Sequence, residues 1–280
     1  MYSENSGSAQ MNLLRRIGRA LRRVFPRGGL YAQALAFNLF ITVFPLLLLC
    51  VTLLAGSRGA SSALEELLRD RWMLPASSRD IIFPYLHQHT TNPGRWLLIG
   101  LIGTILAGTQ CMGVLLESFR MMEGVGRKSF WKQFLQSIGL LCLALVPALA
   151  EVVVTVFGRV VRLWIARQFG LPPFLQIFWI VLAAVTAWFF AVLILGLLYR
   201  AGQPCIRTFR EGLPGAVLAT VLWVCSNVLF GAYMARTPYG PVYGGLAAII
   251  GLLVWLQLSA LVVFVGAAYN LEKLGVPPLR

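Results

Sequence analysis

Two long apolar runs near the end of the chain limit its fold more than any other feature. They are Leu213–Ala235 and Val242–Tyr269, and the second contains no charged residue. About 20 apolar residues cross the hydrocarbon core of a bilayer, which is roughly 30 Å thick. Each run is therefore long enough to span a membrane.

The connector between these runs, Arg236–Pro241, is short, so the two helices must lie antiparallel and side by side. Gly240 and its flanking prolines break the helix at this point. Gly244 and Gly245 are small enough to let the second backbone approach the first closely. We therefore expect this hairpin to be the centre of the protein.

The composition indicates that the whole chain, not only this hairpin, belongs to a membrane protein: of its 280 residues, 58% are hydrophobic and 12% are charged. Such values exclude an ordinary soluble domain. We predict an all-α, polytopic membrane protein whose membrane domain covers residues 30–270, with a tail at 271–280. Six runs have spanning length: Leu30–Ala55, Trp96–Leu116, Phe134–Phe157, Ile177–Leu198, Leu213–Ala235 and Val242–Tyr269.

Residues 1–29 form a basic N-terminal segment with a predicted amphipathic helix at 12–25. Apolar residues recur there at helical spacing: Leu14, Ile17, Leu21 and Val24. Arginines fill the other face: Arg15, Arg16, Arg19, Arg22 and Arg23. A basic amphipathic helix is typical of an anionic membrane surface, so membrane lipids with anionic headgroups are the expected partners. The alternative is that the arginines only enforce orientation.

The formal charge of +14 lies between the apolar runs, which indicates membrane topology and argues against a nucleic-acid partner. Fifteen Lys and Arg residues lie at the termini and in the second and fourth connections, and nine lie in the other three. Basic residues favour the cytoplasmic side. We expect a multi-pass protein of the bacterial inner membrane with both termini in the cytoplasm.

The long external loop, residues 56–95, is predicted to be helical. Ser62 and Glu65 have the spacing of a capping box before an apolar stripe. His87 and His89 could face one side of an extended segment, but no third ligand is near them, so no metal site is predicted. The loop is the expected contact site for an envelope protein partner, and a homo-oligomer is the other association considered.

Glu151 is the strongest candidate for an intramembrane functional group. It lies within the third apolar run, one helical turn after Pro147, which tends to kink the helix. A carboxylate beside a kink could bind a cation or a proton. The alternative is that the span ends early and Glu151 lies among the lipid headgroups.

Other polar residues within the spans could line one interior or form hydrogen bonds between helices. They are Asn38, Thr42, Gln110, Asn227 and Gln257. Pro45 is expected to interrupt the first span. A stripe of small residues on the second span predicts close packing of another helix: Gly100, Gly103, Thr104, Ala107 and Cys111.

The sequence lacks the common signatures of catalysis. It has no Walker A motif and no HExxH or GxSxG segment, and its five cysteines show no paired spacing. We therefore expect no enzymatic activity, no disulfide framework and no cofactor.

Four stretches resemble the YihY/BrkB family of bacterial inner-membrane proteins, some of which once carried the label ribonuclease BN. They are ALAFNLFITVFPLLLL (Ala34–Leu49), RKSFWKQFL (Arg127–Leu135), LLYR with LPGAVLATVLW (Leu197–Arg200 and Leu213–Trp223), and the closing block Tyr239–Asn270. The resemblance implies six spans with both ends in the cytoplasm, in agreement with the charge count.

The chain departs from the family pattern at three positions. Asn38 replaces a tyrosine, Thr42 replaces a serine, and Ala268 replaces the glutamate of the GAELN ending. The resemblance implies transport or export of a lipid or small solute, envelope integrity and a link to serum resistance and virulence. The alternative is a scaffold for envelope assembly that transports nothing. A nuclease is supported only by net charge.

Overall fold

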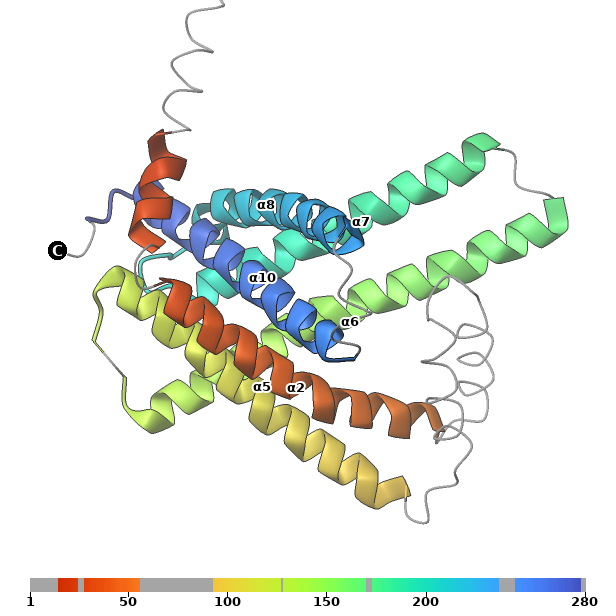
Figure 1. Ribbon diagram of the computed structural model, residues 1–280, viewed down its shortest axis with the longest axis horizontal. Coiled ribbons are helices and arrows are strands. Elements are labelled where there is room, and N and C mark those ends of the chain that lie inside the picture. The colour runs from red at the N-terminus through yellow and green to blue at the C-terminus, as the bar shows by residue number, and fades with distance from the viewer. Residues whose placement is uncertain are drawn as a thin grey trace, which may run out of the picture. The chain divides into compact units, whose positions relative to one another are not determined.

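A computed structural model describes residues 15–24, 28–55, 93–126, 128–169, 173–236 and 245–277. These residues form helices and no strands (Figure 1). After a short helix at 15–24, the long helices are α2 (Gly28–Ala55), α5 (Pro93–Glu123), α6 (Phe130–Phe169), α7 (Pro173–Gly202), α8 (Phe209–Arg236) and α10 (Gly245–Lys273).

Six helices in the described chain are long and apolar enough to cross a membrane, which confirms the six predicted spans and the all-α fold. The helices exceed the apolar runs at several ends. The largest extension is in α6, whose 40 residues correspond to about 60 Å at 1.5 Å per residue. Because the hydrocarbon core is roughly 30 Å thick, α6 must continue beyond the membrane or tilt strongly.

Local chemistry sets the helix ends. Pro93 and Pro173 open α5 and α7, where a missing N–H costs nothing. The carboxylate of Glu211 accepts the N–H groups of Arg207 and Thr208 and so caps the start of α8. Gly124 and Gly275 have positive φ of 72° and 73° just after α5 and α10. In each case the next N–H bonds back to the last helical turn, which is the Schellman ending.

The described residues divide into two compact units. The first lies within Met1–Phe37 and Met112–Arg280, and the second is Asn38–Cys111. Helices α2 and α5 each contribute one part to each unit. The two units are described separately below.

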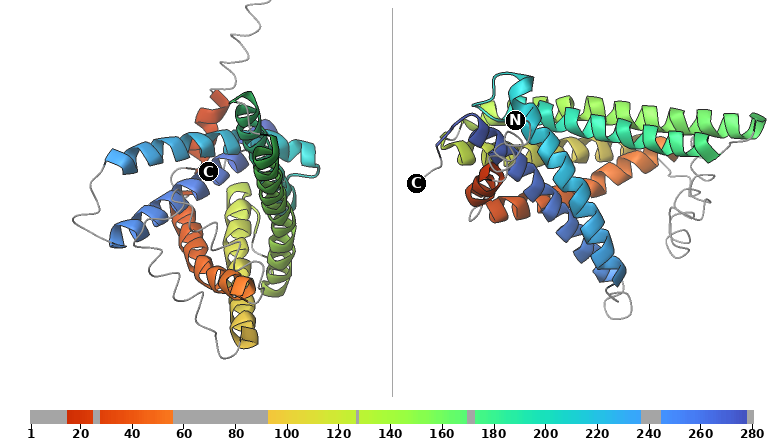
Figure 2. Two further views of the ribbon diagram at one scale, coloured as in Figure 1. Left: turned by 90° about the vertical axis from the view of Figure 1, so that its right-hand side faces the viewer. Right: turned by 90° about the horizontal axis from the view of Figure 1, so that it is seen from above.

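In the first unit, α8 packs against both α7 and α10, and α6 packs against α7. Figure 2 shows α6 with α7 and α8 with α10 as two pairs that diverge from a shared end. The buried core lies at that end, where the rings of Phe119, Tyr199 and Phe264 meet edge to face at 5.8 and 6.2 Å. Bulky aromatic side chains thus fix α5, α7 and α10 to one another.

The predicted antiparallel hairpin is present. Trp223 of α8 donates to Ser259 of α10, and Trp255 of α10 donates to Asn227 of α8. The closest backbone approach is at Gly215 and Gly266, at the opposite end of the hairpin from the connector. Gly240 and Gly244 lie outside the described residues, and Gly245 is the first residue of α10.

In the second unit, α5 lies against α2 along the predicted small-residue stripe. A Cβ added at Gly100 would lie 2.9 Å from the backbone nitrogen of Leu49, and one at Gly103 would lie 2.8 Å from Pro45. Real Cβ contacts are not this short, so both positions require glycine for this packing. The predicted close approach of another helix is therefore confirmed.

Candidate functional site

The described polar groups concentrate at the shared end of the first unit. We call this region the polar end: helix 15–24, residues 124–126 and 128–129, the connection 203–208, and residues 272–277. Arg23 is its central residue, with a side chain only 4% exposed. Its guanidinium donates to the carbonyl groups of Met122 (3.2 Å), Val276 (2.8 Å) and Pro277 (2.9 Å).

These contacts make Arg23 a cap for α5 and a clamp on the segment that follows α10. Met122 is in the last turn of α5, whereas Val276 and Pro277 lie three and four residues beyond the end of α10. Carbonyl groups at a helix C-terminus lack intrahelical partners and carry partial negative charge, so a guanidinium is a favourable neighbour. The prediction that all five arginines lie on the outer face of helix 15–24 is therefore wrong for Arg23. The apolar face is also rotated, since Val24 is buried and Leu21 is 40% exposed.

Glu272 supplies the acidic partner at this end. Its carboxylate lies 3.4 Å from Nη1 of Arg23 and 3.6 Å from Nε of Arg19. The Glu272 side chain is 10% exposed, whereas that of Arg19 is 63% exposed. The pair with Arg23 is thus shielded from water, and the pair with Arg19 is largely solvated and weak.

A second buried cation, Arg120, lies near the connection between α5 and α6. It is 3% exposed, and its Nη2 donates to Oε1 of Gln136 at 3.3 Å. Lys128 donates to the same oxygen at 2.9 Å. The pKa of Lys128 is lowered by desolvation and then by the positive charges of Arg120 and Lys132. Two cations therefore share one amide oxygen.

Glu123, at the end of α5, accepts the backbone N–H of Cys205 at 3.1 Å and so ties α5 to the connection between α7 and α8. Burial raises the pKa of the Cys205 thiol to about 11, and the hydrogen bond and charge of Glu123 add to the effect. Nearby, the buried Gln203 donates to the carbonyl of Ala267 at 3.3 Å. These contacts join three helices without a catalytic arrangement.

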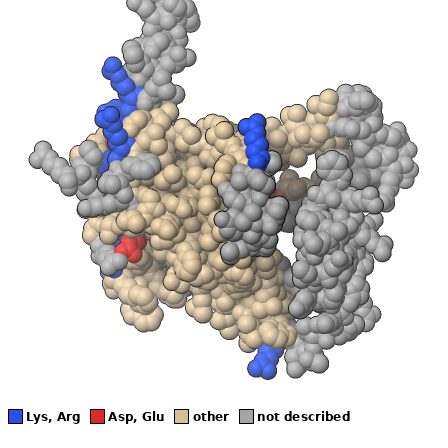
Figure 3. All heavy atoms as spheres, viewed as in Figure 1, with Lys and Arg blue, Asp and Glu red and all other residues tan. Residues whose placement is uncertain are grey.

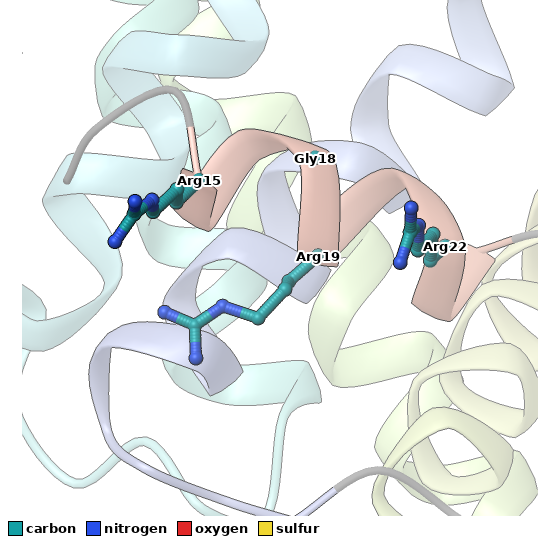
Figure 4. A pocket seen from close by; sticks show the side chains of 4 residues that line it. All are labelled: Arg15, Gly18, Arg19 and Arg22. Atoms are coloured by element: carbon teal, nitrogen blue, oxygen red, sulfur yellow. The ribbon is translucent and has the colours of Figure 1, made fainter. Parts of the chain in front are cut away.

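A depression of about 540 Å³ lies at the outer face of helix 15–24, and the described residues that line it are Arg15, Gly18, Arg19 and Arg22. Figure 4 shows the three arginine side chains extending from the helix. In Figure 3, blue side chains gather at the upper left, and fewer charged side chains appear elsewhere among the coloured residues of this face. Among the described residues, the carboxylate paired with a lining arginine is that of Glu272, which also pairs with Arg23, so the described lining is strongly electropositive.

The structure places Glu151 on α6 with a half-buried side chain. It forms no ion pair or hydrogen bond with another described residue. At 1.5 Å per residue, it lies about 28 Å along the helix from Lys132. If Lys132 marks one membrane boundary, Glu151 lies near the other. Pro147, one turn earlier, is buried.

The remaining predicted polar residues are divided between the two units. Asn38, Thr42 and Gln110 belong to the second unit, together with Pro45. The hydroxyl of Thr42 donates to the carbonyl of Asn38 within its own helix, and Gln110 is exposed.

Asn227 and Gln257 belong to the first unit. Asn227 accepts the indole N–H of Trp255 at 2.8 Å, so it forms a hydrogen bond between helices, and Gln257 is exposed.

No three His, Cys, Asp or Glu side chains cluster as metal ligands within the part of the chain that the structure describes. His87 and His89, and the predicted helical loop that carries them, lie outside the described residues.

The sequence pattern did not predict the polar end. Its one readable signal was the spacing Thr208–Phe–Arg–Glu211, a capping box that begins α8.

Comparison with known proteins gives a consistent picture. The family described as "Virulence factor BrkB" matches residues 25–273. The putative ribonuclease-like protein YfkH of Bacillus subtilis is 24% identical over 258 residues, covering 89% of this chain and 93% of that protein.

Two further relatives carry the description UPF0761 membrane protein. That of Glaesserella parasuis is 24% identical, covering 78% of this chain and 75% of its own length. That of Aromatoleum aromaticum is 27% identical, covering 85% of this chain and 58% of its own length. No solved structure matches the chain.

Proposed function

Because the chain belongs to the BrkB family of membrane proteins, we propose that it moves a lipid or a small solute across the bacterial inner membrane and so supports envelope integrity. The orientation that fits the distribution of Lys and Arg places the polar end in the cytoplasm. Both termini would then lie on the cytoplasmic side.

One observation carries the proposal: in the first unit the buried core lies at the polar end, whereas the protein itself buries little of the surface of the spans. The protein buries only 11% of the residues in an 18-residue apolar stretch of α7, against 39% in the corresponding stretch of α10. Helices that are fixed at one end and make few contacts elsewhere can change their separation at low energetic cost. Such a rearrangement is what alternating access to the two membrane faces requires.

The exposed residues of α7 favour a lipid over a polar solute. Ile177, Phe178, Ile180, Val181 and Val185 are all more than half exposed. An apolar surface of this kind accommodates acyl chains, whereas a polar solute would need a hydrated path. Glu151 is the candidate group for coupling, since its half-buried carboxylate has no partner among the described residues.

The test is flux in proteoliposomes that hold the full chain, read with fluorescent phospholipid and with proton and ion reporters. We expect flux with the wild type, none with empty liposomes and a loss of at least tenfold with Glu151→Gln. Glu151→Asp retains a carboxylate and should keep much of the flux. Equal flux with Glu151→Gln would remove this residue from the mechanism.

Absence of flux from correctly inserted wild-type protein would overturn the transport proposal and favour a scaffold for envelope assembly. Co-purification would then reveal an envelope partner or a second copy of the chain. The chain is also proposed not to be an enzyme, although the printed name of its B. subtilis relative includes the words ribonuclease-like. RNA incubated with the pure protein and Mg²⁺ should stay intact.

A further inference from the structure

The described lining of the depression at helix 15–24 is strongly basic. Arg15, Arg19 and Arg22 recur at intervals of four and three residues, so their side chains lie on one helical face. Gly18 lies among them, and a Cβ added there would meet no atom within 4 Å. The glycine thus leaves open space between three cationic side chains.

The charges of this depression are not neutralised within the described protein. Arg19 pairs with Oε2 of Glu272 at 3.6 Å and Arg23 pairs with Oε1 at 3.4 Å, so a single negative charge is shared by two guanidinium groups. Arg15 and Arg22 form no ion pair with a described acidic residue. Guanidinium groups bind phosphate oxygens in a bidentate manner, so three of them around an open space suit a phosphate group.

The position of the helix favours a phosphate carried by a lipid. Only residues 25–27 separate helix 15–24 from α2, whose candidate span begins at Gly28. The depression therefore lies within a few residues of the membrane boundary. Leu21 is 40% exposed and follows Gly18 by one helical turn, so an apolar side chain flanks the arginines.

The helix is also held in a fixed position. Ala20 and Val24, on its inner face, are fully buried. Arg23 donates hydrogen bonds to carbonyl groups at the end of α5 and in the segment that follows α10. An amphipathic helix without fixed contacts to the rest of the protein would attract anionic lipids by its overall charge, without recognising one headgroup. A fixed helix presents its three outer arginines in one arrangement, which permits recognition of one headgroup.

We propose that Arg15, Arg19 and Arg22, with the space left by Gly18, form a specific site for the phosphate-bearing headgroup of an anionic phospholipid. The site does not depend on transport, and it would remain if the flux experiment gave a negative result. Arg16 and Arg23 belong to the same helix but do not line the depression.

The test is lipid binding to the detergent-purified full chain, measured by native mass spectrometry. The probes are phosphatidylglycerol, phosphatidylcholine with the same acyl chains, and glycerol phosphate as the headgroup without acyl chains. The site variant is Arg15→Gln with Arg19→Gln and Arg22→Gln. Its charge-matched control is Arg16→Gln with Arg207→Gln and Arg210→Gln, which removes three positive charges from the polar end and the adjoining first turn of α8.

We expect the wild type to prefer phosphatidylglycerol over phosphatidylcholine. Each arginine near an anionic lipid contributes about 1 kcal/mol, or about fivefold, so the site variant should lose more than tenfold in affinity for phosphatidylglycerol. The control should lose less than twofold. Gly18→Leu keeps every charge but fills the depression, and it should lose at least fivefold.

Three results would overturn the proposal. Equal losses in the site variant and its control would show that charge acts diffusely. An unchanged affinity in Gly18→Leu would show that the depression is not used. Displacement of phosphatidylglycerol by equimolar glycerol phosphate would show that the ligand is a soluble phosphate compound. Melting temperatures of all variants should equal that of the wild type, because Arg15, Arg19 and Arg22 are exposed.

Discussion

Gly215 of α8 and Gly266 of α10 meet backbone to backbone. A Cβ added to Gly215 would collide with the carbonyl of Gly266, and one added to Gly266 would lie 2.5 Å from the carbonyl of Gly215. The hydroxyl of Tyr199 from α7 lies at the same distance from that added Cβ. Three helices thus share a point at which no side chain fits.

Replacing either glycine by alanine should destabilise the protein. The added methyl group would have to push apart two helix backbones, and overpacking of this kind typically costs about 1–3 kcal/mol. We expect a lower melting temperature for Gly215→Ala and Gly266→Ala in detergent, followed by intrinsic tryptophan fluorescence. Gly139→Ala and Gly231→Ala are matched controls, since an added Cβ there meets nothing within 4 Å. A control that melts as low as the Gly215 variant would contradict this explanation.

Arg23 should matter far more for stability than its neighbour Arg22. Removing one member of a buried ion pair costs up to about 3–5 kcal/mol, and the exposed Arg19 would compensate Glu272 only weakly. Arg23→Ala would also leave the carbonyl groups of Met122 and Val276 without their donor. Arg22→Ala, on the exposed face, should change the free energy of unfolding by about 0.5 kcal/mol or less. Thermal melting of the two variants tests this contrast, and equal melting temperatures would refute it.

Asn270 is fully buried and joins the end of α10 to the start of α8. Its Oδ1 accepts the N–H of Gly215 at 2.7 Å, and its Nδ2 donates to the carbonyl of Gly212 at 3.1 Å. Asn270→Ala removes both bonds and should cost about 2 kcal/mol. Asn270→Asp should cost more, because an ionised carboxylate cannot donate to Gly212. Gln257→Ala serves as the control, since Gln257 is exposed, and thermal melting is the measurement.

The thiol of Cys205 should be slow to alkylate near neutral pH. Its pKa is raised from 9.0 to about 11, and only the thiolate reacts, so its alkylation rate at pH 8 should be about 100-fold below that of an unperturbed thiol. The rate should rise tenfold per pH unit up to the pKa. Mass spectrometry of the Cys205 peptide after timed iodoacetamide treatment gives this rate.

Two substitutions should shift the Cys205 reaction in opposite directions. Glu123→Gln removes a negative charge that raises the pKa of Cys205, so alkylation should accelerate at pH 8. Arg23→Gln removes a positive charge that lowers the pKa, so alkylation should slow. Shifts of the same sign in both variants would mean that local unfolding, and not charge, controls the reaction.

The spans were predictable because each apolar run is sufficient by itself. A stretch such as Val242–Tyr269 has no stable place in water, and its backbone must be satisfied within a helix once it is in lipid. The short connector Arg236–Pro241 then made the antiparallel pair of α8 and α10 unavoidable. The small-residue stripe with Gly100 and Gly103 was readable for a similar reason, since small side chains permit close packing of a neighbouring helix.

The polar end was not predictable, because its partners are far apart in the chain. Arg23 and Glu272 are separated by 249 positions, and neither differs in sequence from an ordinary surface charge. Helical periodicity assigned Arg23 to the same polar face as Arg22. The contact with the ends of α5 and α10 turned it inward instead, because unpaired carbonyl groups there accept its donors.

The sequence by itself determined the all-helical fold, the six spans and the family, since apolar length and local motifs are properties of neighbouring residues. The tertiary structure decided where the helices touch and which charges are buried. It revealed the close approach of α8 and α10 at Gly215 and Gly266, and it separated Arg23 from the three arginines that line the depression beside Gly18. Packing and charge burial depend on groups that only the folded chain brings together.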